Sequence, residues 1–259
     1  MSGPAVARSR CLAAGRRLAS LVVFVALLSS GAASAVGVVS LEAPSGLQPL
    51  LEKHLGFIGE KSGDELDEGG RVALLRRARK EVADILATEG HFKPSVEGRE
   101  TPGGGFAVVV DPGPRTTIAE VELHFGGVVA GAAERLDALR AAWALPVGQP
   151  FRQADWDAAK QQLLDGLSLR DYAAAAITAS EALIDPESAS ARLRVDIDSG
   201  RAFRFGSIEV TGLADYDRSL LERYQPPDPG EPYSQERLLR YQTALQNTPY
   251  FASVVVDID

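Results

Sequence analysis

The chain has one cysteine, one methionine and three histidines among its 259 residues. The cysteine, Cys11, lies within the first 35 residues, so the remainder has no disulfide and must be held together by packed cores. After residue 35 no apolar run approaches the 18 or so residues typical of a membrane-spanning helix. The formal net charge of −8 argues against nucleic acid and anionic lipid surfaces as partners.

The first 35 residues contain no acidic side chain. An apolar run from Leu18 to Leu28 follows four arginines: Arg8, Arg10, Arg16 and Arg17. Ala33-Ser34-Ala35 then forms a small-residue site, and the whole order predicts a secretory signal peptide cleaved after Ala35. Its removal takes away four positive charges and changes the net charge from −8 to −12. A twin-arginine signal and lipid attachment at Cys11 are minor alternatives.

No pattern of catalytic or metal-binding residues stands out. The three histidines, His54, His91 and His124, lie on separate predicted elements without H-x-x-x-H spacing, and no G-x-S-x-G elbow occurs. The glycines at 103–105 lack the Lys-Ser/Thr of a phosphate loop and precede a strand, which favours a hairpin turn. We therefore expect no enzyme, no metal and no cofactor.

A basic cluster at Arg76, Arg77, Arg79 and Lys80 has helical spacing. We interpret it as a solvated helix face, with docking to an acidic partner as the alternative.

The hydrophobic pattern of residues 114–200 predicts the order β-α-α-β-β. A half-buried strand at 118–125 is followed by helices at 132–143 and 153–167. The second helix is expected to bury one apolar stripe, formed by Trp156, Ala159, Leu163, Leu164 and Leu167. A long Ala-rich strand from Tyr172 to Leu183, a turn at 185–188 and an alternating strand at 191–198 complete the unit.

The same order begins again 87 positions later. Phe205-Gly-Ser-Ile-Glu-Val210 corresponds to the strand that starts near Ile118, and Ser234 is an expected N-cap of the next helix. A strand is expected at 252–258, and there the unit stops one strand short. Residues 36–113 follow the order more loosely, with strands at 36–41, 93–97 and 106–110 and helices at 47–55 and 68–88. In the longer helix Val72, Leu75, Ala78, Val82, Ile85 and Leu86 are expected to face inward. Such a period predicts an array of modules.

The repeating unit resembles the polypeptide-transport-associated (POTRA) domain. The segment Phe205–Gly212, two helices and then Tyr250–Val256 are similar to that domain, and Tyr172–Gly200 resembles the second such domain of TamA-like proteins of the BamA superfamily. The resemblance implies an α+β fold of tandem βααββ domains, each a small mixed sheet covered by two helices. The expected boundaries are a signal peptide at 1–35 and domains at 36–113, 114–200 and 201–259, the last one incomplete.

The resemblance implies a periplasmic arm of an outer-membrane protein or autotransporter assembly factor. Implied partners are a TamB-like protein anchored in the inner membrane, unfolded outer-membrane proteins or autotransporters, and the membrane through a C-terminal β-barrel that lies outside this sequence. We accordingly expect an exported protein at the periplasmic face of the outer membrane, and a fragment or truncated gene product. A periplasmic enzyme or solute-binding protein and a structural cell-division protein are the alternatives.

The Ala-rich strand is the candidate binding site. Small side chains and few charges favour pairing of its edge with an extended client strand, through Tyr172, Ala174, Ala176, Thr178 and Ser180. The competing interpretation is a hairpin arm that packs on the neighbouring domain. Both interpretations remain open from the sequence.

Overall fold

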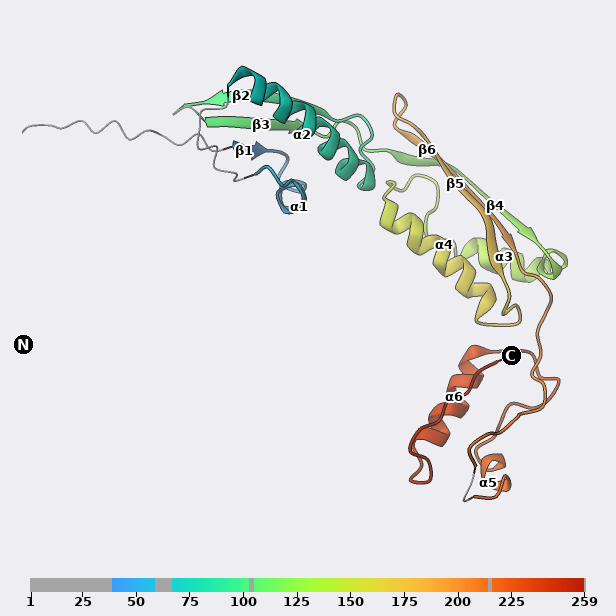
Figure 1. Cartoon of the computed structure of the whole chain (residues 1–259). Coiled ribbons are helices and arrows are strands. Elements are labelled where there is room, and N and C mark those ends of the chain that lie inside the picture. The colour runs from blue at the N-terminus through green and yellow to red at the C-terminus, as the bar shows by residue number, and fades with distance from the viewer. Residues whose placement is uncertain (1–38, 59–66, 103–104, 214–215, 259) are drawn as a thin grey trace, which may run out of the picture. The chain divides into compact units, whose positions relative to one another are not determined.

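The computed structural model describes residues 39–58, 67–102, 105–213 and 216–258. The predicted signal peptide, with Ala33 and Ala35, lies outside the described residues. Within them the chain forms two three-stranded mixed sheets, each of which shares a core with two α-helices (Figure 1). The fold class is therefore α+β, as the sequence predicts.

The first sheet has the order β1-β3-β2. Its strands are β1 (Val39–Glu42), β2 (Ser95–Thr101) and β3 (Gly105–Asp111). β1 runs parallel to β3, and β2 runs antiparallel to it. Helices α1 (Gln48–His54) and α2 (Glu68–Thr88) contribute Leu51, Val82 and Leu86 to the core, all fully buried.

Helix α2 has a clear start and stop. The Asp67 side chain accepts a hydrogen bond from the Gly70 N–H (2.6 Å), as an N-cap does. At the other end the His91 N–H donates to the Leu86 carbonyl and the Gly90 N–H to the Ala87 carbonyl, with Gly90 at φ +89°. This is a Schellman cap, which favours glycine at that position.

The buried stripe of α2 is narrower than the sequence predicts. Ala78, Val82 and Leu86 are buried at intervals of four residues, whereas Val72 is 62% exposed. Val72 precedes Ala78 by six residues, and at 3.6 residues per turn this places the two side chains on different faces. The expectation that Val72 faces inward is wrong.

The second sheet repeats this arrangement with the order β4-β6-β5. Its strands are β4 (Thr117–Gly126), β5 (Ala176–Asp185) and β6 (Ser190–Asp198). β6 pairs in parallel with β4 and antiparallel with β5. The short helix η1 (Val128–Gly131) precedes α3 (Ala133–Ala141) and α4 (Gln153–Ser168). The stripe predicted on α4 is confirmed, because Trp156, Ala159, Leu163 and Leu167 are buried against β6 residues.

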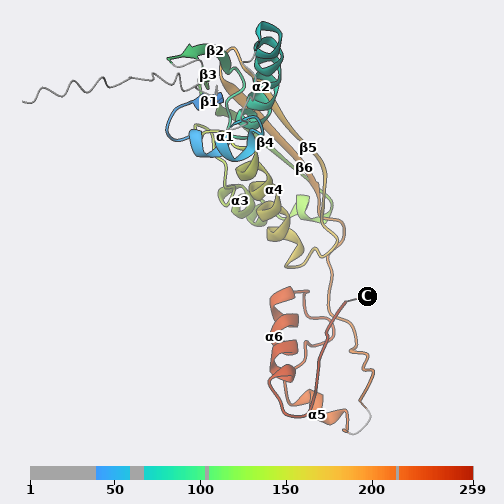
Figure 2. The same cartoon turned by 60° about the vertical axis from the view of Figure 1, so that its left-hand side comes forward.

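The described residues after 200 form two helices and no strand. These are α5 (Ser219–Glu222) and α6 (Gln235–Gln246) (Figure 2). The Ser234 hydroxyl accepts from the Arg237 N–H (3.3 Å), as expected of the N-cap of α6. The strands predicted at 205–210 and 252–258 are absent from this described part. In both complete sheets the central strand is the last one along the chain. The described residues after 200 contain no strand with which residues 205–210 or 252–258 could pair. No helix in the described ranges is long and apolar enough to span a bilayer.

Gly90→Ala should destabilise the protein more than Gly148→Ala. Both glycines have φ +89°, so alanine is strained at either position by roughly 1–2 kcal/mol. A Cβ at Gly90 would lie 2.1 Å from the Phe151 carbonyl oxygen, whereas at Gly148 it would meet no described atom within 4 Å. Urea unfolding of the two variants measures the difference. Equal losses would contradict the close approach of the chain at Gly90.

Candidate functional site

Strand β5 begins four residues later than the sequence predicts. Asp171 has φ +67°, and the Ala175 N–H donates to the Tyr172 carbonyl (2.9 Å), so a turn precedes the strand. Tyr172 is 8% exposed and belongs to the core of the second sheet. Tyr172 and Ala174 therefore lie outside the strand, and the expectation that they form part of it is wrong.

The remaining three candidates, Ala176, Thr178 and Ser180, lie on β5, which contains a bulge. Ile177 pairs with Ile197 and Ala179 with Asp196, which leaves Thr178 as an extra residue between them. The Thr178 hydroxyl donates to the Asp196 carbonyl (3.1 Å).

The bulge changes which side chains face the core, because strand side chains alternate between the two faces. Before it, Ile177 lies opposite the buried Ile197; after it, Ala182 lies opposite the buried Leu193 and Ile184 opposite the buried Ala191. Inward-facing apolar side chains thus have odd numbers before the bulge and even numbers after it. The strand is regular from Ala179 to Asp185, so an added strand could pair continuously along these residues.

The outer edge of β5 has no strand beside it among the described residues, because β5 is the last strand of its sheet. Its ten residues carry two charged side chains, Glu181 and Asp185. The opposite edge strand β4 carries two glutamates and a histidine, and β2 has seven residues with three charges. Leu183 on β5 is 50% exposed. Edge strands are usually protected by charge or by short length. β5 is longer and less charged than β2, whereas β4 has the same length as β5 and carries a histidine in addition to two acidic residues.

The turn at the end of the β5–β6 hairpin is built around Asp185. Its carboxylate accepts from the Glu187 N–H (3.0 Å) and from the Ser188 hydroxyl (2.6 Å). These hydrogen bonds, first that of Ser188, lower the pKa of Asp185 from its usual value. The turn also reaches Lys93, whose ammonium lies 2.7 Å from the Glu187 carboxylate in an exposed ion pair.

The solvent-facing side of β6 carries a small charged network. The Asp196 carboxylate accepts from the Arg194 guanidinium (3.0 Å) and lies 2.8 Å from the His124 ring nitrogen. Arg194 first, and His124 second, lower the pKa of Asp196. The Arg194 guanidinium and the His124 ring both stabilise the ionised carboxylate in an exposed setting, which is a structural role.

The histidines are separate in space as they are in sequence. His91 Nδ1 lies 3.2 Å from the Gly113 carbonyl, His124 contacts Asp196, and His54 ends α1. No group of three or more metal-ligating side chains occurs in the described ranges.

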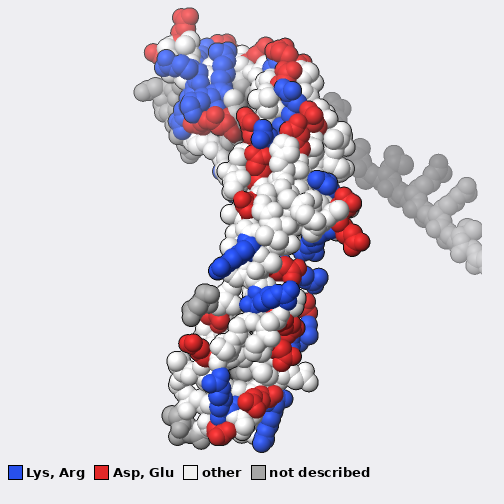
Figure 3. Space-filling model, turned by 90° about the vertical axis from the view of Figure 1, so that its right-hand side faces the viewer, with Lys and Arg blue, Asp and Glu red and all other residues white. Residues whose placement is uncertain are grey.

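The basic residues of α2 mostly interact with nearby groups: Arg77 pairs with Glu81, Lys80 with Asp84, and Arg79 donates to the Val96 carbonyl. Figure 3 shows acidic and basic side chains interspersed on one face of the molecule.

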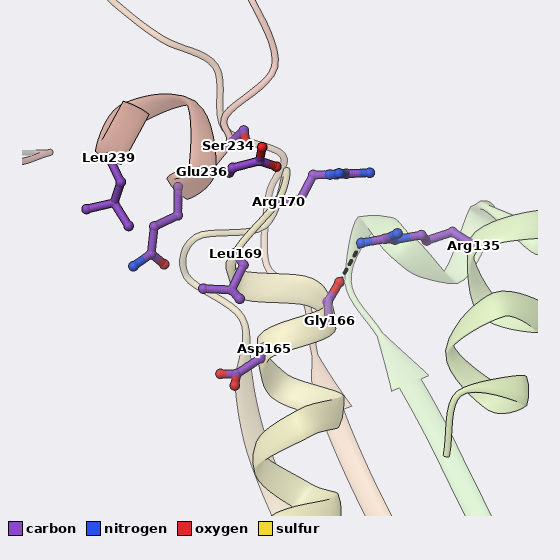
Figure 4. Close-up of a pocket in the computed structure, with 9 residues that line it drawn as sticks. Arg135, Asp165, Gly166, Leu169, Arg170, Ser234, Glu236 and Leu239 are labelled. Carbon is purple, nitrogen blue, oxygen red and sulfur yellow. Dashed lines mark hydrogen bonds between the residues drawn. The ribbon is translucent and has the colours of Figure 1, made fainter. Parts of the chain in front are cut away.

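A shallow groove of about 590 Å³ lies where the end of α4 meets the start of α6 (Figure 4). Leu169 (44% exposed) and Leu239 (49% exposed) line it together with Arg170 and Arg135. The Arg135 guanidinium donates to the Gly166 carbonyl, while its Nε is buried without a partner. Ser234 also lines the groove, and its hydroxyl caps α6 by accepting from the Arg237 N–H (3.3 Å).

Comparison with known proteins gives matches among solved structures alone: no family model and no curated protein matches. The Haemophilus influenzae BamA POTRA3-5 structure is 16% identical, with a TM-score of 0.47, over 85% of this chain and 88% of that chain. The N-terminal domain of Omp85 from Thermosynechococcus elongatus is 15% identical, with a TM-score of 0.35, over 86% and 89%. POTRA1-3 of Omp85 from Anabaena is 13% identical, with a TM-score of 0.36, over 86% and 88%.

Asp185→Ala should loosen the β5–β6 hairpin, because it removes both acceptors of the turn. Amide hydrogen exchange of β5 should become faster, whereas Asp185→Asn should change it less because it keeps an amide oxygen as acceptor. The pKa of Asp185 is lowered in the folded state, so its contribution is present above the unfolded pKa and is lost as the pH falls through the folded pKa. Exchange in Asp185→Ala as slow as in the parent protein at neutral pH would contradict this role.

Proposed function

We propose that this chain is the periplasmic arm of an outer-membrane protein assembly factor of the BamA superfamily. Its three POTRA-like modules, at 36–113, 114–200 and 201–259, bind client or partner polypeptides. The observation that carries the proposal is the open, sparsely charged edge of β5 in the second sheet. A bare strand edge offers N–H and C=O groups to any extended chain, so it can bind many clients without reading their sequence.

Backbone pairing sets the form of the interaction. The stretch after the bulge, Ala179–Asp185, is seven residues long and spans roughly 23 Å at about 3.3 Å per residue. An added strand would pair there and place an apolar side chain near Leu183, which is half exposed. Hydrogen bonds exchanged with water contribute modestly, about 0.5–1.5 kcal/mol each. A strand of this length should therefore bind reversibly, as a transient client requires.

Within the superfamily, we assign the chain to the TamA-like assembly factors. The segment Tyr172–Gly200, with Ser180 and the Asp185-Pro186 turn, supports this assignment by resemblance. The partners that follow are a TamB-like protein and unfolded autotransporters or outer-membrane proteins. The predicted signal peptide supports export to the periplasm.

A hairpin arm that packs on the first module is the second candidate role for β5 and β6. The ion pair between Lys93 and Glu187 favours it, since it joins the hairpin turn to the segment before β2. Both partners are exposed, and exposed ion pairs contribute about 0–1 kcal/mol. The contact lies at the turn and leaves the edge of β5 open, so the two roles are compatible.

Proline substitutions at Ser180 and Glu181 test the edge. The two are neighbours on β5, so the N–H of one faces β6 and that of the other faces outward. Proline at the outward-facing position should weaken binding of a labelled outer-membrane β-strand peptide by roughly tenfold or more, with unchanged circular dichroism. Fluorescence anisotropy measures the affinity.

Ser180→Ala and Glu181→Ala are the matched controls, because alanine keeps the N–H groups. They should bind the peptide as the parent protein does. Full affinity in both proline variants, with the fold intact, would exclude β5 as the client-binding edge. A parallel pull-down with the periplasmic tail of a TamB-like protein shows whether partner and client use the same edge.

A further inference from the structure

The shallow groove where the end of α4 meets the start of α6 has two sides that backbone contacts hold together. The Gln235 N–H donates to the Leu169 carbonyl (2.9 Å), and the Asp171 N–H donates to the Tyr233 carbonyl (2.9 Å). A surface with a preformed shape loses less conformational entropy when it binds a ligand. We call this surface the α4–α6 groove and define it by six of the residues that line it: Arg135, Leu169, Arg170, Ser234, Glu236 and Leu239.

Leu239 lies on the outer face of α6. The buried residues of this helix are Tyr241 and Leu245. At 3.6 residues per turn, Leu239 is separated by about 160° from Tyr241 and by about 120° from Leu245 around the helix axis. In the second module the sheet packs on the buried stripe of α4. Leu239 therefore points away from the face of α6 on which a sheet packs, and its 49% exposure belongs to the groove itself.

Two guanidinium groups of the groove have no carboxylate partner in the described part of the chain. Arg135 is half-buried and donates to the Gly166 carbonyl, while its Nε is buried without an acceptor among the described residues. Arg170 is exposed, and its side chain forms neither a hydrogen bond nor an ion pair with another described residue. The positive charge of both groups is thus available to a ligand.

The carboxylates that line the groove have other partners. Glu236 pairs with Arg240, and Asp165 accepts a hydrogen bond from the Gln161 amide (2.7 Å). In the view of Figure 4, Asp165 lies on the side of the two leucines, opposite the two arginines. Charges are screened beyond about 8–10 Å at physiological ionic strength, so the guanidinium groups and not the net charge of −8 determine which ligand fits beside them. A carboxylate is the complementary group.

We propose that the α4–α6 groove binds a segment of a partner polypeptide in which acidic side chains stand next to apolar ones. The carboxylates of this segment would form ion pairs with Arg135 and Arg170. Its apolar side chains would cover Leu169 and Leu239, which are 44% and 49% exposed. The inference rests on residues other than those of the β5 edge and does not depend on the proposed function.

The shape of the surface favours an internal segment over a chain end. A second hollow shares Glu236 and Leu239 with the groove and continues along the outer face of α6 to Thr243 and Asn247. A bound segment can therefore continue past the leucines along the helix. The groove accordingly takes the carboxylates of aspartate or glutamate side chains, and a terminal carboxylate is not required.

The probe is a fluorescein-labelled peptide with the sequence Gly-Ser-Asp-Glu-Leu-Ser-Leu-Gly-Ser and an amidated C-terminus. It is titrated into the 259-residue chain and its anisotropy is recorded. Saturable binding is expected, and replacement of Asp and Glu in the peptide by Asn and Gln should weaken the affinity by roughly tenfold or more. Binding should also weaken as the salt concentration rises from about 0.05 M to about 0.3 M. The same peptide with a free C-terminal carboxylate should bind equally well.

Two variants of the chain, each with a matched control, locate the binding site. Arg170→Gln should weaken binding of the amidated peptide by roughly tenfold, whereas Arg223→Gln should not, because Arg223 is exposed and does not line the groove. Leu239→Ala should weaken binding by roughly fivefold. Leu183→Ala should leave it unchanged, although Leu183 on β5 is as exposed as Leu239. Circular dichroism checks that all four variants keep the fold.

Absence of saturable binding up to about 1 mM peptide would overturn the proposal. Unchanged affinity in either Arg170→Gln or Leu239→Ala would overturn the groove as the site, and equal affinity for the Asn/Gln peptide would overturn recognition of carboxylates. Stronger binding of the peptide with a free C-terminus would overturn the internal segment. The proline variants at Ser180 and Glu181 should bind this peptide as the parent protein does, so failure of the β5 proposal and failure of this one give different results.

Discussion

The central strand β6 is the element on which the second module depends. It pairs with β4 on one side and β5 on the other, and it supplies four buried apolar residues to the core that α3 and α4 complete. β6 is the last strand of its module along the chain, so β4 and β5 both pair with a strand that follows them in the sequence. The same arrangement places β4 and β5 at the two edges, so an open edge is a direct consequence of the topology.

The edge at β5 is open but not featureless. The bulge at Thr178 lets Ile177 and Ile184 both face the core although they differ in parity, and it separates a short first part of the strand from the seven residues that follow. Bulges also increase local twist, which hinders long continuous pairing and so limits aggregation. β5 therefore has an accessible edge, and the bulge limits the length over which another strand can pair with it. This combination suits brief contact with an unfolded client.

Regular periodicity made much of this fold predictable. The bounds of α2, the buried stripe of α4 and the alternation of β6 follow from apolar residues at helical or strand spacing. Two kinds of feature did not follow. β5 starts late because Asp171 has a positive φ and Tyr172 is buried in the core. The bulge at Thr178 depends on how β5 pairs with β6. Neither feature is indicated by the residues next to it in the sequence. The extended segments after 200 have strand-like sequences, but strand formation requires a partner that sequence periodicity does not report.

Residue-resolved amide hydrogen exchange on β5, with and without an unfolded outer-membrane protein, tests the central claim most directly. Pairing at the edge predicts that the client slows exchange at every second residue of Ala179–Asp185, the residues whose N–H groups face outward, while the amides bonded to β6 change little. Unchanged exchange along the whole of β5 at a client concentration that saturates binding would contradict the account.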